Sequence, residues 1–148
     1  MAKPFLFVFA LVPITTLAAA PTPILAAQPA RFAPCGAGPR VDCVVDGDTF
    51  WLSGAKIRIA DINTPETGGA ACPAEAALGH AATARLTALL NAGPFTLAPW
   101  SAANGRVRER DRYGRLLRVV ERYGHSLGGA LVSEGLAEPW RGKRGTWC

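Results

Sequence analysis

Short β-rich runs separated by turn residues are the feature that most constrains the fold of this 148-residue chain. The run 41–45 leads through a turn at 46–48 into a second run, 49–52, and a turn at 53–54 leads into a third, 56–62. Apolar and charged residues alternate in the third run, which is the period of a half-buried strand. The first two runs and their Asp-Gly-Asp turn predict a β-hairpin.

Two further β-rich runs, 95–99 and 116–121, are joined by the polar loop 101–112. Between the third and fourth runs, the spacing predicts a helix over 73–91, with a proline at its first position and Gly93 after its end. Its apolar stripe comprises Leu78, Ala82, Leu86, Leu89 and Leu90.

Ser126 is typical of a helix cap, and we expect it to begin a short second helix that ends near Gly135. Five short strands with a helix after the third predict an α+β fold. We expect a five-stranded OB-fold barrel of the Greek-key type, with two or three helices packed outside it.

The N-terminus has the pattern of a secretory signal peptide over residues 1–27. Lys3 precedes a short apolar run, and small residues follow, so we expect cleavage between residues 26 and 30. A membrane anchor is the alternative if the leader is not cleaved, but Pro13 and Pro21 interrupt the run before it reaches the roughly 20 residues that a span needs. The sequence therefore predicts a secreted or periplasmic protein.

Without the leader, about 120 residues remain, the size of one domain. We expect an N-terminal segment over 28–40, which contains Cys35, and the OB-fold domain over 41–148. The formal net charge of +5 becomes +4 when Lys3 is removed. Seven arginines lie between Arg106 and Arg122 against three acidic residues. This distribution suits a polyanionic partner, although a solvated, salt-bridged hairpin explains many of these arginines equally well.

Four cysteines in an exported chain predict two disulfides, for which three pairings are possible. The four residues are Cys35, Cys43, Cys72 and Cys148. The loop 36–40 contains glycine and proline and lets the first two residues bridge, which would leave the last two for each other. The sequence itself does not decide the pairing, and it contains no CxxC pair typical of a zinc site.

Oxygen-bearing side chains gather at two neighbouring turns, 46–48 and 63–66. Hard cations such as Ca²⁺ prefer oxygen ligands. Arg58 lies on the strand between these turns, and a guanidinium can bind a phosphate through two parallel hydrogen bonds. A cation, an arginine on the phosphate and a base that orients water are what the hydrolysis of a phosphodiester requires.

Three motifs together resemble the thermonuclease family, also called staphylococcal-nuclease-like. They are Val45-Asp46-Gly47-Asp48-Thr49, then Arg58 followed by Asn63-Thr64-Pro65-Glu66, and Asp111-Arg112-Tyr113-Gly114-Arg115. The likeness extends over about residues 41–140. It implies an OB-fold barrel, dependence on Ca²⁺, and hydrolysis of DNA and RNA at the 5′ phosphorus–oxygen bond, which leaves 3′-phosphates. The implied protein is a monomer that prefers single-stranded or transiently open nucleic acid.

The resemblance also implies a role for each matched residue. Asp48, Asn63 and the Thr64 carbonyl would ligate calcium, with Asp46 supporting them from behind. Glu66 would hold the attacking water as a general base or as its orienter, and Arg58 and Arg115 would bind the scissile phosphate. Tyr113 and Arg112 would contact the substrate. The matched positions are Asp46, Asp48, Arg58, Asn63, Thr64, Glu66, Arg112, Tyr113 and Arg115.

The chain departs from the family pattern at two places. Asn63 stands where the family usually has an aspartate, so one ligand charge is lost and we expect weaker calcium binding. At the C-terminus the family's third helix and tyrosines are replaced by a segment that contains Trp140 and Arg141. Trp140 could stack on a base and Arg141 could contact a phosphate; alternatively, Trp140 covers the core.

The competing hypothesis is an OB-fold module that binds single-stranded nucleic acid or another polyanion without cutting it. A module of that kind has no need for Asp48, Arg58, Glu66 and Arg115 together. The chain contains all four residues, which favours the nuclease.

Overall fold

The computed structural model describes residues 31–102 and 104–148. The expected leader and its cleavage region, residues 1–30, lie outside the described residues. Within the described ranges, no helix has the length and apolar character that crossing a membrane requires.

The first three strands form an antiparallel meander. β1 (Cys43–Asp46) pairs with β2 (Thr49–Leu52), and β2 pairs with β3 (Ala55–Ile59). The register of β1 shifts between Val44 and Asp46, and this irregularity places the turn 46–48 at the end of the hairpin. The expected hairpin and the alternation of β3 are therefore confirmed.

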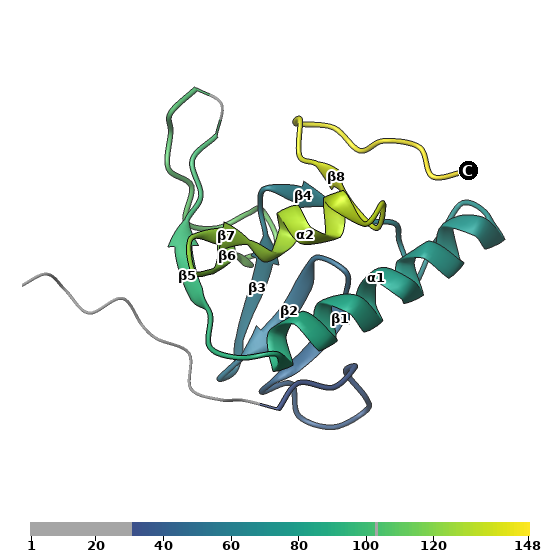
Figure 1. Cartoon of the computed structure of the whole chain (residues 1–148), viewed down its shortest axis with the longest axis horizontal. Coiled ribbons are helices and arrows are strands. Elements are labelled where there is room, and N and C mark those ends of the chain that lie inside the picture. Colours follow the sequence, from purple (N-terminus) through teal and green to yellow (C-terminus); the bar gives the residue numbers. More distant parts are fainter. Residues whose placement is uncertain (1–30, 103) are drawn as a thin grey trace, which may run out of the picture.

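β6 (Leu116–Arg122) runs parallel to β3 and continues the sheet. β5 (Thr96–Pro99) pairs with β6 in the antiparallel sense, and β7 (His125–Ser126) pairs with the end of β6. The sheet order is β1-β2-β3-β6-β5, with β7 on β6 (Figure 1). Among the described residues no strand pairing joins β1 to β5, so the ladder is a curved mixed sheet rather than a closed barrel.

The prediction of five strands is not confirmed, because the described residues form eight. The run 56–62 divides: β3 ends at Ile59, the chain turns, and β4 (Ile62–Asn63) pairs instead with β8 (Glu138–Pro139). The turn is fixed by the N–H of Ala60, which donates to the Arg118 carbonyl, and by the N–H of Trp140, which donates to the Asp61 carbonyl. Both bonds come from residues distant in the sequence, so local pattern does not reveal the break.

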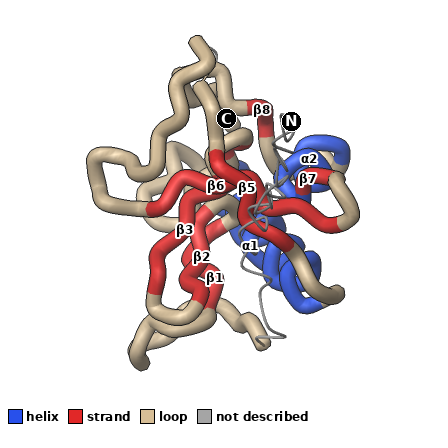
Figure 2. The backbone as a smooth tube through the Cα atoms, turned by 90° about the vertical axis from the view of Figure 1, so that its left-hand side faces the viewer, coloured by secondary structure: helices blue, strands red, loops and turns tan. Residues whose placement is uncertain are grey.

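The two helices of the described chain agree with the prediction. α1 (Pro73–Asn91) has the expected bounds, and α2 (Leu127–Ser133) begins after Ser126, whose hydroxyl accepts a hydrogen bond from the Gly129 N–H at 3.0 Å. Figure 2 shows both helices on one side of the strands.

The core lies between the sheet and the helices. Phe32, Phe50 and Phe95 meet at ring-centroid distances of 5.9 to 6.2 Å. Around them pack fully buried aliphatic side chains from the sheet and both helices, namely Val44, Ile57, Ile59, Ile62, Leu86, Val120 and Leu131. Burial of each such side chain contributes about 1.5–3 kcal/mol to the free energy of unfolding.

Both disulfides are present, Cys35–Cys43 and Cys72–Cys148. The first closes a short loop against β1, where the Cys35 N–H donates to the Val44 carbonyl. The second joins the last residue of the chain to the residue that precedes α1, and the C-terminal segment in Figure 1 runs back to that end of the helix. The pairing left open by the sequence is thereby decided.

Candidate active site

Asp48 lies at the centre of the candidate site, in the turn between β1 and β2. Its side chain is largely buried, and its Oδ2 forms an ion pair with Nη1 of Arg58 at 3.0 Å. The antiparallel register explains the contact, because Arg58 on β3 faces Thr49, the residue after Asp48. Oδ2 also accepts a hydrogen bond from the Thr64 N–H at 3.3 Å, so the two turns predicted from the sequence meet at one carboxylate.

Thr49 connects Asp48 to the second expected arginine. The Thr49 hydroxyl donates to Oδ1 of Asp48 at 2.9 Å and accepts from Nη1 of Arg115 at 3.3 Å. A continuous chain of polar contacts therefore runs from Arg58 through Asp48 and Thr49 to Arg115. The two guanidinium groups are brought to the same site from β3 and from the residue that precedes β6.

In the turn 111–115, Asp111 holds the backbone of the turn and the side chain of Arg115 in place. Oδ1 of Asp111 accepts from the N–H groups of Tyr113 and Arg115 at 2.9 and 3.0 Å, and Oδ2 accepts from Nε of Arg115 at 2.6 Å. Gly114 has φ +78°, which other residues adopt only with strain. Burial alone would raise the pKa of Asp111, but the hydrogen bonds and charge of Arg115 outweigh it and hold this pKa below its usual value. Asp111 stays ionised and orients Arg115.

Asp46 lies in the same turn as Asp48 and contacts its backbone. Its Oδ1 accepts a hydrogen bond from the Asp48 N–H at 3.1 Å. Burial, and then the negative charge of Asp48, raise the pKa of Asp46 to about 7. When two carboxyl groups lie this close together, the negative charge of one disfavours ionisation of the other, and a nearby positive charge offsets this effect.

The remaining expected ligands come from the end of β4. Asn63 and Thr64 are both buried. Asn63 faces Glu138 across the β4–β8 pair, and its Nδ2 donates to Oε1 of Glu138 at 3.0 Å. A neutral amide suits this position, because an aspartate there would place a second negative charge directly opposite Glu138.

The donors expected for a calcium ion are a carboxylate oxygen of Asp48, the amide oxygen of Asn63 and the carbonyl oxygen of Thr64. All are oxygen atoms, which are the ligands that this ion prefers. Among residues 31–102 and 104–148, no three His, Cys, Asp or Glu side chains cluster as metal ligands. The expected site therefore depends on Asn63 and the Thr64 carbonyl for its remaining protein oxygens.

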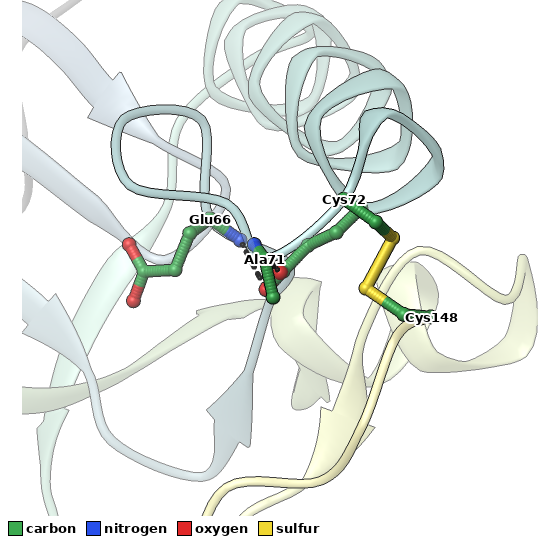
Figure 3. The surroundings of a disulfide bond; sticks show 5 residues. Glu66, Ala71, Cys72 and Cys148 are labelled. Atoms are coloured by element: carbon green, nitrogen blue, oxygen red, sulfur yellow. Dashed lines mark hydrogen bonds between the residues drawn. A yellow bond between two sulfur atoms is a disulfide. The ribbon is translucent and has the colours of Figure 1, made fainter.

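Glu66 lies at the start of a loop that α1 holds in place (Figure 3). Glu75, a buried carboxylate in the first turn of α1, accepts hydrogen bonds from the N–H groups of Glu66 at 3.3 Å and of Ala71 at 2.6 Å. A Cβ added at Gly79 would lie only 2.6 Å from the Glu66 carbonyl oxygen. The helix can therefore approach the Glu66 backbone this closely only because Gly79 has no side chain.

A cleft of about 630 Å³ lies beside Arg58 and Arg115. Five arginines and one acidic residue line it, together with three aromatic side chains. The arginines are Arg58, Arg108, Arg112, Arg115 and Arg144, and the aromatic residues are Trp100, Tyr113 and Trp140. A lining of guanidinium groups and aromatic side chains has the composition of a surface that binds single-stranded nucleic acid.

The expected substrate-binding residues divide between this cleft and a second hollow. Tyr113 is 67% exposed, and its hydroxyl accepts from Nη2 of Arg112 at 2.6 Å. Trp140 lines the same cleft, as the base-stacking alternative requires. Arg141 instead lines a smaller hollow of about 320 Å³ with Glu138 and Lys143.

A family model described as "Staphylococcal nuclease homologue" matches residues 56–145. The chain belongs to this family. A comparison with curated proteins finds no match. The matched range includes Arg58, Glu66 and Arg115, whereas Asp48 lies before it and joins the site through the contacts described above.

For this staphylococcal nuclease homologue, family membership implies the OB-fold, and the mixed sheet with two outer helices is the form in which the chain builds it. Nucleases of the family act on nucleic acid. The basic cleft lies where the expected phosphate-binding arginines meet.

Sequence reasoning missed several residues that build the site. Thr49 links Asp48 to Arg115, Glu75 supports the Glu66 loop, Glu138 holds Asn63, and Arg144 pairs with the Glu66 carboxylate. Only Thr49 carried a sequence signal, as part of the first motif. The others reach the site through contacts between different segments, 9 to 78 positions apart in the chain.

Proposed function

We propose that the protein is a secreted, calcium-dependent nuclease that hydrolyses phosphodiester bonds of DNA and RNA. The observation that carries this proposal is the chain of contacts from Arg58 through Asp48 and Thr49 to Arg115, on the edge of an arginine-rich cleft. It combines a carboxylate suited to a cation with two guanidinium groups suited to one phosphate.

Arg58 and Arg115 bind the two non-bridging oxygens of the scissile phosphate and offset the charge that grows there during attack. Their orientation is preset, because Asp48 holds the first and Asp111 holds the second. Glu66 orients the attacking water and accepts its proton. Calcium, when bound by Asp48, Asn63 and the Thr64 carbonyl, supplies positive charge that lowers the cost of forming hydroxide.

Attack from the Glu66 side with cleavage of the 5′ oxygen leaves a 3′-phosphate. The hydroxyl of the exposed Tyr113 can donate to that phosphate. The guanidinium carbon of Arg112 lies 4.8 Å from the centroid of the Tyr113 ring. Trp140, in the same cleft, offers a flat surface for a base. Single-stranded or transiently open substrate suits such stacking, because the bases must leave their partners.

Two disulfides support an oxidising compartment and hence export. The proposed enzyme acts as a monomer. Mass measurement of the protein recovered outside the cytoplasm tests cleavage of the leader between residues 26 and 30. Recovery of the full-length mass in the membrane fraction would establish the anchored alternative.

The decisive experiment incubates the purified protein with single-stranded DNA, with calcium or with chelator. We expect degradation only with calcium, and products whose 3′ ends a polymerase can extend only after removal of a 3′-phosphate. Glu66→Gln and Arg58→Ala should each lower kcat by about a hundredfold or more. Binding of the oligonucleotide without cleavage would replace the nuclease with the non-catalytic OB-fold module. Full activity in both variants would show that the cleavage does not come from this site, and would likewise remove the support for the nuclease.

A further inference from the structure

The last nine residues, 140–148, form a segment tied down at three points, which we name the C-terminal strap. The Trp140 N–H donates to the Asp61 carbonyl at 2.8 Å, and the Gly145 N–H donates to Oε1 of Glu138 at 2.6 Å. The disulfide Cys72–Cys148 fixes its end. The strap therefore crosses from β8 to the start of α1, past the loop that carries Glu66 (Figure 3).

Arg144 lies between the first and second of these ties, directly before Gly145. Its guanidinium forms an ion pair with Oε1 of Glu66 while 66% of its side chain remains exposed. It also lines the 630 Å³ cleft together with Arg58 and Arg115. The strap thus brings a third arginine to the site from a part of the chain that none of the three sequence motifs includes.

The partners of the three arginines differ in one respect. Asp48 and Asp111 hold Arg58 and Arg115, and the proposed mechanism leaves both of those pairs in place. The partner of Arg144 is Glu66, whose carboxylate must be free to hold the attacking water. A polyanion that enters the cleft offers Arg144 other oxygens, and an exposed ion pair is weak enough to exchange.

We propose that Arg144 is a substrate-binding residue that rests on Glu66 in the free protein and moves to a phosphate of the bound strand. The strap, closed by Cys72–Cys148, keeps the arginine within reach of both positions. Binding of nucleic acid then releases Glu66 at the moment when the substrate arrives. This inference deepens the proposed function and rests on it.

Lys143 provides a matched control. It precedes Arg144 on the strap and carries the same charge, but it lines the smaller hollow and not the cleft. Both side chains are on an exposed segment, so replacement of either by alanine should leave thermal unfolding unchanged. A difference between Arg144→Ala and Lys143→Ala therefore reports the contact with substrate rather than net charge or stability.

The experiment measures binding of a short, fluorescently labelled single-stranded DNA by anisotropy in chelator, at several salt concentrations. We expect Arg144→Ala to raise Kd on the order of fivefold and to lower the slope of log Kd against log salt by about 0.7, the value for one phosphate contact on a single strand. Lys143→Ala should change both quantities much less. In calcium, Arg144→Ala should raise KM more than it lowers kcat.

A second arm tests the strap. In the double variant Cys72→Ser/Cys148→Ser, Kd should rise as in Arg144→Ala, and adding Arg144→Ala should change it little further. Measurements are made below the unfolding temperature of this variant. A full additional loss on adding Arg144→Ala would show that the disulfide does not position the arginine.

Equal effects of Arg144→Ala and Lys143→Ala on Kd and slope would overturn the proposal. Tighter binding or faster cleavage by Arg144→Ala would also overturn it, and would make the strap an inhibitory cover. Binding is measured in chelator, without hydrolysis. If the wild-type protein binds DNA through Arg144 but does not cleave it in calcium, that result contradicts only the proposed nuclease function. A protein that cuts normally with Arg144→Ala refutes only this inference.

Discussion

Asp48 and Arg58 form an ion pair of 3.0 Å with only 10% and 12% of their side chains exposed. One is the expected calcium ligand, and the other is the expected phosphate clamp. Arg58 therefore supplies positive charge beside the neighbouring carboxylates of Asp46 and Asp48. This ion pair stabilises the fold as well as holding both side chains in position.

Loss of Arg58 should destabilise the protein more in chelator than in calcium. We expect Arg58→Ala to lower the free energy of unfolding by about 2 kcal/mol in chelator, because a largely buried carboxylate loses its partner. Calcium should restore much of this loss by binding the same carboxylates. Urea unfolding in both conditions measures the effect. Arg85→Ala, which removes an exposed ion pair with Glu134, is the control and should change little.

Restoration of the family's aspartate at position 63 should depend on Glu138. Asn63→Asp alone places two carboxylates opposite each other across the β4–β8 pair, so it should destabilise the protein in chelator. With Glu138→Gln added, we expect the calcium concentration for half-maximal activity to fall about tenfold below wild type, since the site gains a ligand charge. Activity is titrated against calcium for wild type, the two single variants and the double variant. An unchanged calcium concentration for half-maximal activity in the double variant would contradict a role for Asn63 as a ligand.

A methyl group at Gly79 should displace the Glu66 loop. The added Cβ would lie 2.6 Å from the Glu66 carbonyl oxygen, so Gly79→Ala should lower the free energy of unfolding by about 1–3 kcal/mol and lower kcat. Gly68→Ala lies in the same loop, where an added Cβ meets no atom within 4 Å. It should leave both quantities close to wild type. Equal effects of the two variants on kcat would contradict a close approach at Gly79.

The two disulfides should contribute unequally to stability. Cys72–Cys148 joins residues separated by 76 positions and Cys35–Cys43 by 8, so the first restricts the unfolded chain more. We expect losses of about 4 kcal/mol for Cys72→Ser/Cys148→Ser and about 2.5 kcal/mol for Cys35→Ser/Cys43→Ser. Denaturant unfolding of both double variants measures them, and an inverse order would show that the C-terminal strap is already held without its disulfide.

The local elements follow from the sequence pattern. The alternation of 56–59 specified β3, and Pro73, Ser126 and the apolar spacing specified both helices, because strand period, proline placement and capping depend on neighbouring residues. The three motifs likewise identified Asp48, Arg58 and Arg115 as members of one site. Turns of this kind fix their own side chains, as Asp111 does for Arg115.

The distant residues that complete the site are known only from the packing of the folded chain. Four features depend on contacts between residues 9 to 79 positions apart: the break between β3 and β4, the pairing of Asn63 with Glu138, the support of Glu66 by Glu75 and the contact of Arg144 with Glu66. Such contacts leave no periodic trace in the sequence, since they depend on how the sheet, α1 and the C-terminal strap pack together. Asn63, a departure from the family pattern in sequence, acquires its physical reason only there, opposite the negative charge of Glu138.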